Sequence, residues 1–196
     1  YQLQGKKILI SVGRLTQRKG LNEFIDLGFS KIVQAIPNTT LVVIGDTPDQ
    51  SLNKHLQSKE LIISTAKKNQ IENNIVFTGN ITDDNILSNF YYLADVHVFP
   101  VKHIPADPEG FGMVAIEAAA HGTPTVAFAT GGIVDAVQHG KTGYLIEKQN
   151  YQSMVHTVIQ LLENKNLLND KLCIQHAEQF AWYNLKHKFE KVIVSL

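Results

Sequence analysis

The stretch that decides the fold is DPEGFGMVAIEAAAHGTP, residues 107–124. It follows an apolar run over 95–100 that predicts a buried strand, and Pro124 ends its helical pattern just before the next apolar run, 125–128. A strand, a glycine-bearing turn and a helix that starts at the turn form an anion-binding corner, because the first N–H groups of a helix have no partner inside it. The stretch therefore predicts an anion site at the start of this helix.

Two carboxylates, Glu109 and Glu117, stand at this corner, where an anion would repel them if they faced it. A ligand that is anionic at one end and rich in hydroxyl groups at the other removes the conflict, and a nucleotide sugar is such a ligand. Glu109 would also be favoured near a helix start in any protein, through the helix dipole. Glu117 lies in a helix that is apolar nearly all round, so its charge needs a partner. Ligand hydroxyls would serve, as would a structural Arg, Lys or backbone group.

Apolar runs alternate with helical patterns along the whole chain. We expect strands at 7–12, 40–45, 75–79, 95–99, 125–128 and 144–146, and helices at 21–36, 52–68, 86–93, 113–121, 133–137, 151–162, 172–180 and 182–196. Nearly continuous apolar strands, each followed by a helix, indicate a parallel sheet covered on both faces. The prediction is one α/β domain over 1–196, a Rossmann-like doubly wound parallel sheet with C-terminal helices over about 151–196.

The composition bounds the classes of function. With 18 Lys and Arg against 18 Asp and Glu the formal net charge is zero, so no overall field attracts anionic lipid or nucleic acid, and we expect no nucleic-acid partner. A single cysteine, Cys173, excludes an internal disulfide framework and fits a packed thiol better than a nucleophile. No apolar run approaches the roughly 18 residues of a membrane span, and no signal peptide is recognised. The chain does not begin with Met, and we expect a fragment of a longer, cytoplasmic protein.

The loop after the first predicted strand carries Arg14 and Lys19 between Gly13 and Gly20. A cationic pair at the carboxyl end of a strand suits a diphosphate, with Arg as a fork and Lys as a point charge. The alternative is an ordinary solvated loop, because Arg18 and Lys19 are adjacent and lysines are common on surfaces. The spacing matches neither a P-loop nor the GxGxxG turn of dinucleotide-binding enzymes, which argues against a dehydrogenase.

Two histidines, His103 and His121, lie nearest this corner and lack both an HExxH arrangement and an evident carboxylate partner. The helix dipole explains His121 at a helix C-terminus, whereas His103, in the loop before Glu109, is less easily dismissed. We expect no metal site and no cofactor.

The whole pattern resembles the C-terminal, donor-binding domain of GT-B-fold retaining glycosyltransferases of family 4, the glycosyl transferases group 1. The matching segments follow the family's order along nearly the entire chain: VGRL at 12–15 with KG at 19–20, VIGD at 43–46, VFTG at 76–79, EGFG at 109–112 continuing to Glu117, GTP at 122–124, GG at 131–132 and GKTG at 140–143. The two glutamates with seven residues between them are the most specific signal. Each other segment is weak alone.

The resemblance implies a catalytic set of Arg14, Lys19 and Glu109. The two cations would hold the donor diphosphate and stabilise the leaving group, and Glu109 would contact sugar hydroxyls. The family's reaction transfers a sugar with retention at the anomeric carbon, generally without a bound metal. A cationic pair and a helix N-terminus can replace a metal in neutralising a departing diphosphate, and the transition state is expected to resemble an oxocarbenium ion.

The resemblance also implies further contacts with the donor. We expect them from six residues: Gly13, Gly79, Gly110, Phe111, Gly112 and Glu117. The backbone at 110–112 would contact sugar and phosphate, Glu117 would bind the ribose hydroxyls, and the chain near Gly79 would border the base.

Enzymes of this family have two Rossmann-like domains with the active site between them, and the N-terminal acceptor domain is missing here. The resemblance therefore implies a domain that alone binds donor weakly and catalyses little. Its partners would be a nucleoside-diphosphate sugar, the missing domain, towards which the helix at 182–196 would cross, and a saccharide or lipid-linked acceptor. We expect a cytoplasmic hexosyltransferase of glycan, polysaccharide or glycolipid synthesis, whose full-length form could also sit at the inner face of the membrane.

Two other functions stay open. A non-catalytic nucleotide-sugar sensor or interaction domain would keep the same fold, although the presence of both glutamates and both cations argues against degeneration. A nucleotide-sugar epimerase of the GT-B fold would need catalytic acids that the sequence does not reveal.

Overall fold

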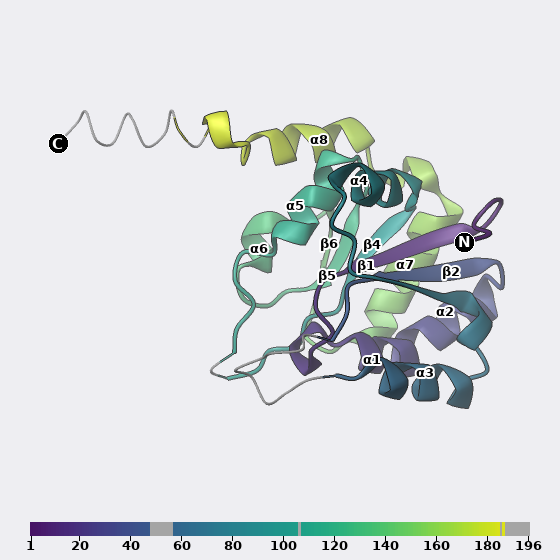
Figure 1. Cartoon of the computed structure of the whole chain (residues 1–196). Coiled ribbons are helices and arrows are strands. Elements are labelled where there is room, and N and C mark those ends of the chain that lie inside the picture. The colour runs from purple at the N-terminus through teal and green to yellow at the C-terminus, as the bar shows by residue number, and fades with distance from the viewer. Residues whose placement is uncertain (48–56, 106, 185, 187–196) are drawn as a thin grey trace.

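The fold is built around one parallel sheet, as predicted. The computed structural model describes residues 1–47, 57–105, 107–184 and 186, and its six strands form one parallel sheet in the order β3-β2-β1-β4-β5-β6 (Figure 1). The strands are β1 (Lys7–Val12), β2 (Thr39–Ile44), β3 (Ile75–Gly79), β4 (Val96–Phe99), β5 (Thr125–Phe128) and β6 (Gly143–Ile146). Their β-branched, apolar residues suit strands that are buried on both faces.

Helices cover both faces of the sheet (Figure 1). One face is covered by α1 (Leu21–Phe24), α2 (Ser30–Ala35), α3 (Lys59–Lys68) and α7 (Tyr151–Glu163), and the other by α4 (Asp84–Leu93), α5 (Met113–Ala120), α6 (Ile133–Ala136) and α8 (Asp170–Glu178). Short 3₁₀ turns lie at Gln17–Lys19, Glu72–Asn74 and Lys165–Leu167. The result is a three-layer α/β domain, which confirms the predicted fold class.

Alternate residues of each strand enter cores on opposite faces, as the two-residue period of a strand requires. On β1, Leu9 packs into the larger core with Phe24 and Phe29, while Ile8 and Ile10 pack on the other side. Phe24 and Phe29 are fully buried, and burial of such a side chain contributes about 1.5–3 kcal/mol.

Besides shifts of one or two residues at helix ends, the helices differ from the sequence expectation in two places. The helix expected at 21–36 is continuous but contains a π-helical turn, Ile25–Phe29, between α1 and α2. The helix expected at 52–68 is described only from α3, which starts at Lys59 because the Ser58 side chain caps it by accepting from the Leu61 N–H. Residues 52–56, and most of the helix expected at 182–196, lie outside the described residues.

The strand order reverses its direction at β1 and β4, the two central strands of the sheet. From β1 the chain passes to β2 on one side, and β4, which also pairs with β1, passes to β5 on the other. Sheets of this order bind ligands outside the carboxyl ends of the strands at such a reversal. The loop at 13–20 and the described residues of 100–112 meet there. Over the residues described, no helix is both long and apolar enough to cross a bilayer.

Candidate functional site

The loop that follows β1 is attached to the loop that follows β4. A 3₁₀ turn, Gln17–Lys19, ends at Gly20, whose φ of 66° is left-handed. A Cβ on Gly20 would come within 2.1 Å of the Pro100 carbonyl oxygen, so only glycine permits this approach. The Lys102 N–H also donates to the Arg18 carbonyl at 2.8 Å. The cations of the first loop are thereby held against the acidic segment of the second.

Glu109 lies at the centre of this contact. Its Oε2 accepts from Lys19 Nζ at 3.0 Å and from Arg18 Nη1. Arg18 Nε also lies 3.3 Å from Asp107 Oδ1. The side chains of Arg18, Lys19 and Glu109 are only 10%, 15% and 11% exposed, so these ion pairs are well shielded from water. The structure thus brings Lys19 and Glu109 together on one rim.

Arg18 overturns one expectation. The adjacency of Arg18 and Lys19 is compatible with a solvated loop, but Arg18 is buried and joins Asp107 to Glu109. Its partners lie about ninety positions away in sequence, and no local pattern reports such a contact. Arg18 is therefore a site residue that sequence reasoning missed.

Lys19 sits in an unusual electrostatic environment. Burial lowers the pKa of its ammonium group, which the Glu109 carboxylate opposes and the charges of Arg18 and Arg14 reinforce. Its Nζ lies 4.7 Å from the centre of the Phe99 ring, a favourable cation–π contact. An added negative charge near Nζ would therefore stabilise the protonated form of Lys19.

Arg14 is exposed and, with Gly13, Lys19 and Phe99, lines a cavity of about 10 Å³. Such a volume admits about one water molecule, not a diphosphate. The Lys19 ammonium group already forms an ion pair with the Glu109 carboxylate. A phosphate that binds to Lys19 would therefore have to share it with Glu109 or displace the carboxylate.

The predicted glycine-rich corner forms as expected. Gly112, with a φ of 81°, precedes α5, and no side chain caps the first turn of that helix. Phe111 packs on Phe180 with ring centres 5.0 Å apart. The segment at 109–110 lies so close to the β5–α6 turn that a Cβ on Gly132 would meet the Gly110 carbonyl oxygen at 2.4 Å. This turn fixes the backbone that carries Glu109.

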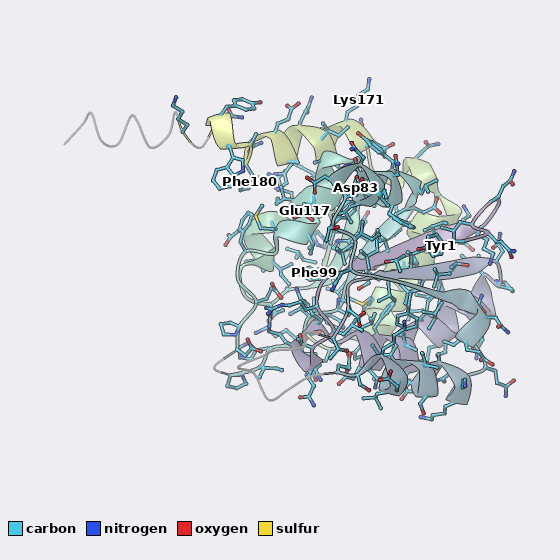
Figure 2. All side chains as sticks on the ribbon, in the orientation of Figure 1. Tyr1, Asp83, Phe99, Glu117, Lys171 and Phe180 are labelled. Atoms are coloured by element: carbon cyan, nitrogen blue, oxygen red, sulfur yellow. The ribbon has the colours of Figure 1, made fainter. Side chains whose placement is uncertain are left out.

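Glu117 has a protein partner of a kind not foreseen. The Tyr91 hydroxyl on α4 donates to Glu117 Oε2 at 2.9 Å, so a phenol, rather than an Arg, Lys or backbone group, meets this carboxylate. Burial raises the pKa of Tyr91, and the nearby carboxylate adds to the rise. Figure 2 shows Glu117 on α5 and Phe99 at the end of β4. The partner of Glu117 is thus separate from the ion pairs that hold Glu109.

His121, at the end of α5, is held in place by neighbours on α4 and α5. Its Nε2 lies 2.6 Å from Ser88 Oγ, and its Nδ1 lies 2.7 Å from the Glu117 carbonyl oxygen. The ring also stacks on Tyr91 at 5.2 Å between centres. These contacts add a packing role to the position at the helix C-terminus that the sequence indicates.

The remaining candidates have different surroundings. Gly79 ends β3, and its carbonyl accepts from Gly45 N at 2.9 Å. Beyond β2 and β3 a cavity of about 440 Å³ is lined by Asp46, Thr47, Ser58, Lys59, Glu60 and Asn80, so the neighbour of Gly79, not Gly79 itself, borders it. His103 is exposed, and Cys173 is a buried thiol whose pKa burial raises to about 11. In the parts of the chain that the structure describes, no three His, Cys, Asp or Glu residues gather as metal ligands would.

Comparison with known proteins decides the family. The family model of glycosyl transferases group 1 matches residues 2–179, which is most of the chain. The chain belongs to the glycosyl transferases group 1 family. The fold and the match over 2–179 are thus those of a glycosyl transferase group 1 protein.

Three similar proteins give the extent of the match. A GDP-mannose-dependent alpha-(1-6)-phosphatidylinositol monomannoside mannosyltransferase of Mycobacterium tuberculosis is 27% identical over all of this chain and 48% of its own length. The C-terminal domain of a Francisella tularensis group 1 glycosyl transferase is 26% identical, with a TM-score of 0.68, 88% of this chain covered and 81% of that domain. Anabaena HepE, solved with UDP, shares the fold at 20% identity, with a TM-score of 0.80, 99% of this chain covered and 50% of that one.

The chain spans about half the length of the curated relatives it matches first. By contrast, it covers 81% of the C-terminal domain solved from the Francisella protein. The catalysis of those relatives is thus a property of proteins about twice as long.

Proposed function

We propose that this chain is the donor-binding domain of a retaining glycosyltransferase, which moves a sugar from a nucleoside-diphosphate sugar to a saccharide or lipid-linked acceptor. The observation that carries the proposal is the contact of Lys19 with Glu109 at the point where the strand order reverses. A cation for phosphate and an acid for hydroxyl groups meet there, outside the carboxyl ends of β1 and β4. The reaction belongs to glycan, polysaccharide or glycolipid synthesis.

Each group at the rim has a part in this proposal. Lys19 and the exposed Arg14 hold the diphosphate and stabilise it as it leaves, with the uncapped start of α5 contributing N–H groups. Glu109 binds sugar hydroxyls and favours the positive charge that develops on the sugar ring. No metal is required, because the cations and the helix start supply the positive charge.

The ribose and base extend along the same edge. Glu117, oriented by the Tyr91 hydroxyl, accepts from the ribose hydroxyls. The cavity beside Asn80 and Asp46 receives the base, close to where the resemblance puts it near Gly79. A second domain supplies the acceptor and closes the site, and this domain alone turns over slowly or not at all.

Thermal unfolding with UDP, GDP and ADP tests the donor site. The UDP of HepE and the GDP-mannose in the name of the mycobacterial relative make the first two the leading probes. A nucleotide at one hundred times its Kd stabilises by about 2.7 kcal/mol, a rise in Tm of roughly 5–10 °C for a chain of this size. We expect Arg14→Ala or Glu117→Ala to remove this rise.

Lys68→Ala is the matched control. Lys68 is an exposed cation in the last turn of α3, and it pairs with Asp26. Because α3 runs back from the carboxyl edge of the sheet, this turn lies away from the rim, and the variant should keep the full rise. A chain that none of the three nucleotides stabilises would contradict the proposal. Transfer from the donor, measured on a protein that includes an acceptor domain, separates an enzyme from a nucleotide-sugar sensor.

A further inference from the structure

The rim contains an electrostatic conflict that the proposed function leaves unsolved. Lys19 is expected to bind a diphosphate, yet the carboxylate of Glu109 lies 3.0 Å from its Nζ, and Asp107 is close by. Two carboxylates beside a diphosphate repel it, and in a shielded site this repulsion is stronger than in water. Another positively charged group must neutralise these acids if Lys19 is to bind the diphosphate.

We propose that Arg18 is the main internal counter-ion of Glu109 and Asp107, so that Lys19, which also contacts Glu109, and Arg14 retain positive charge for the donor diphosphate. This inference rests on the proposed function. Arg18 does not touch the donor itself and is a positioning residue. It holds the carboxylate of Glu109 where that group can reach the sugar.

The geometry of Arg18 fits this task better than that of Lys19. Its guanidinium lies between both acids, with Nη1 on Glu109 and Nε 3.3 Å from Asp107 Oδ1, so that one positive charge serves two carboxylates. Its side chain is 10% exposed, whereas Arg14 is exposed to the solvent from which a ligand arrives. Its carbonyl accepts from Lys102 N, so the backbone on which it sits is fixed as well.

The charges of the cluster lead to the same assignment. Arg14, Arg18 and Lys19 carry three positive charges against the two negative charges of Asp107 and Glu109. With Arg18 removed, the two remaining cations only balance the two acids, and an incoming diphosphate meets no surplus. Lys102, a half-buried cation of the loop after β4, is already paired with Glu23 and adds no surplus positive charge.

The first experiment needs no ligand. Urea unfolding of the chain, Arg18→Met, Glu109→Gln and the double variant forms a thermodynamic cycle. We expect Arg18→Met to destabilise, because it leaves the acids shielded and short of positive charge, and Glu109→Gln to recover part of that loss. Additive effects of the two substitutions would overturn the inference. If Arg18→Met does not fold, the double variant decides, since the inference requires it to fold.

The second experiment measures affinity for UDP, GDP and ADP by calorimetry. These probes lack the sugar that is transferred, so the proposed contact of Glu109 with the hydroxyls of that sugar does not enter. We expect Arg18→Met to weaken binding about tenfold, and Glu109→Gln to restore most of it in that background, because it removes one of the two acids that Arg18 compensates. Arg18→Lys, which keeps the charge, should stay within about threefold of the parent, as should the control Lys102→Met.

The outcomes separate the two proposals. An Arg18→Met variant that binds the nucleotides as tightly as the parent, or an Arg18→Lys variant that binds as poorly as Arg18→Met, overturns the counter-ion assignment. If the unsubstituted chain binds none of the three nucleotides, the proposed function fails. The unfolding cycle then still decides whether Arg18 compensates Glu109.

Discussion

Lys19 is the residue whose charge state the site depends on. Burial lowers its pKa below the usual 10.5, and a diphosphate favours its protonated form. Affinity for UDP or GDP should therefore fall as the pH rises through the lowered pKa, in a range where the nucleotide phosphates are already ionised. Calorimetry between pH 7 and about 10 measures this fall, since the reference lysine pKa marks the upper end. Lys19→Arg, which stays protonated, should abolish it, and an unchanged fall in that variant would assign it to another group.

Tyr91 and Glu117 form the second pair that acts at the scale of single residues. Tyr91→Phe keeps the ring that stacks on His121 and removes only the hydroxyl that donates to Glu117. We expect a loss of about 1.5–3 kcal/mol in unfolding free energy, typical of a hydrogen bond to a charged group, and weaker nucleotide binding. Tyr92→Phe is the control, because Tyr92 is 66% exposed and keeps its edge contact with His121. Equal stability of the two variants would show that the hydroxyl contributes nothing.

At the scale of elements, the turn between β5 and α6 acts as a support for the acidic loop. Gly132 has an ordinary backbone conformation, yet a Cβ there would lie 2.4 Å from the Gly110 carbonyl oxygen. Gly132→Ala should therefore push the 109–112 segment away, cost about 1–3 kcal/mol in unfolding free energy and weaken nucleotide binding. Gly110→Ala is the control for stability, since nothing lies within 4 Å of its added Cβ. A Gly132→Ala variant as stable as Gly110→Ala would contradict this account.

Strands could be predicted from the sequence far better than the details of helices. β1, β3 and β5 have the predicted bounds, because short apolar runs between glycines, prolines and polar turns are strong local signals. The π-helical turn at Ile25–Phe29 is not predicted from the sequence, and within it Gly28 lies against Val155 on α7, a neighbour far along the chain that no local pattern reports.

The predictions for the site differ in the same way, because local features follow from neighbouring residues and contacts between distant residues do not. The glycine-rich corner and the start of α5 follow from neighbouring residues, so the sequence indicates them. The contacts of Arg18 with Glu109 and of Tyr91 with Glu117 join residues 91 and 26 positions apart, and only the topology of the sheet brings them together. Strand order, not local pattern, therefore decides which charges are compensated.

At the scale of the whole molecule, the centre of the sheet holds a group that couples its stability to pH. His97 on β4 is fully buried, its Nδ1 lies 3.1 Å from Thr125 Oγ1, and burial, with a smaller contribution from Lys19, lowers its pKa to about 3. Between pH 6.5 and about 3 the unfolded chain binds a proton at this ring that the folded chain does not, so stability falls as the pH falls.

This coupling predicts a dependence of the unfolding free energy on pH that a substitution of His97 should reduce. One proton per molecule corresponds to about 1.4 kcal/mol of unfolding free energy per pH unit. His97→Gln can still reach Thr125 but does not titrate, so its stability should fall less steeply than that of the parent between pH 6.5 and 4.5, by up to that amount per unit. Urea unfolding at several pH values gives both slopes, and His103→Gln, at an exposed position, should keep the parental one. Equal slopes for His97→Gln and the parent would mean that the acid sensitivity of the domain arises outside its central strand.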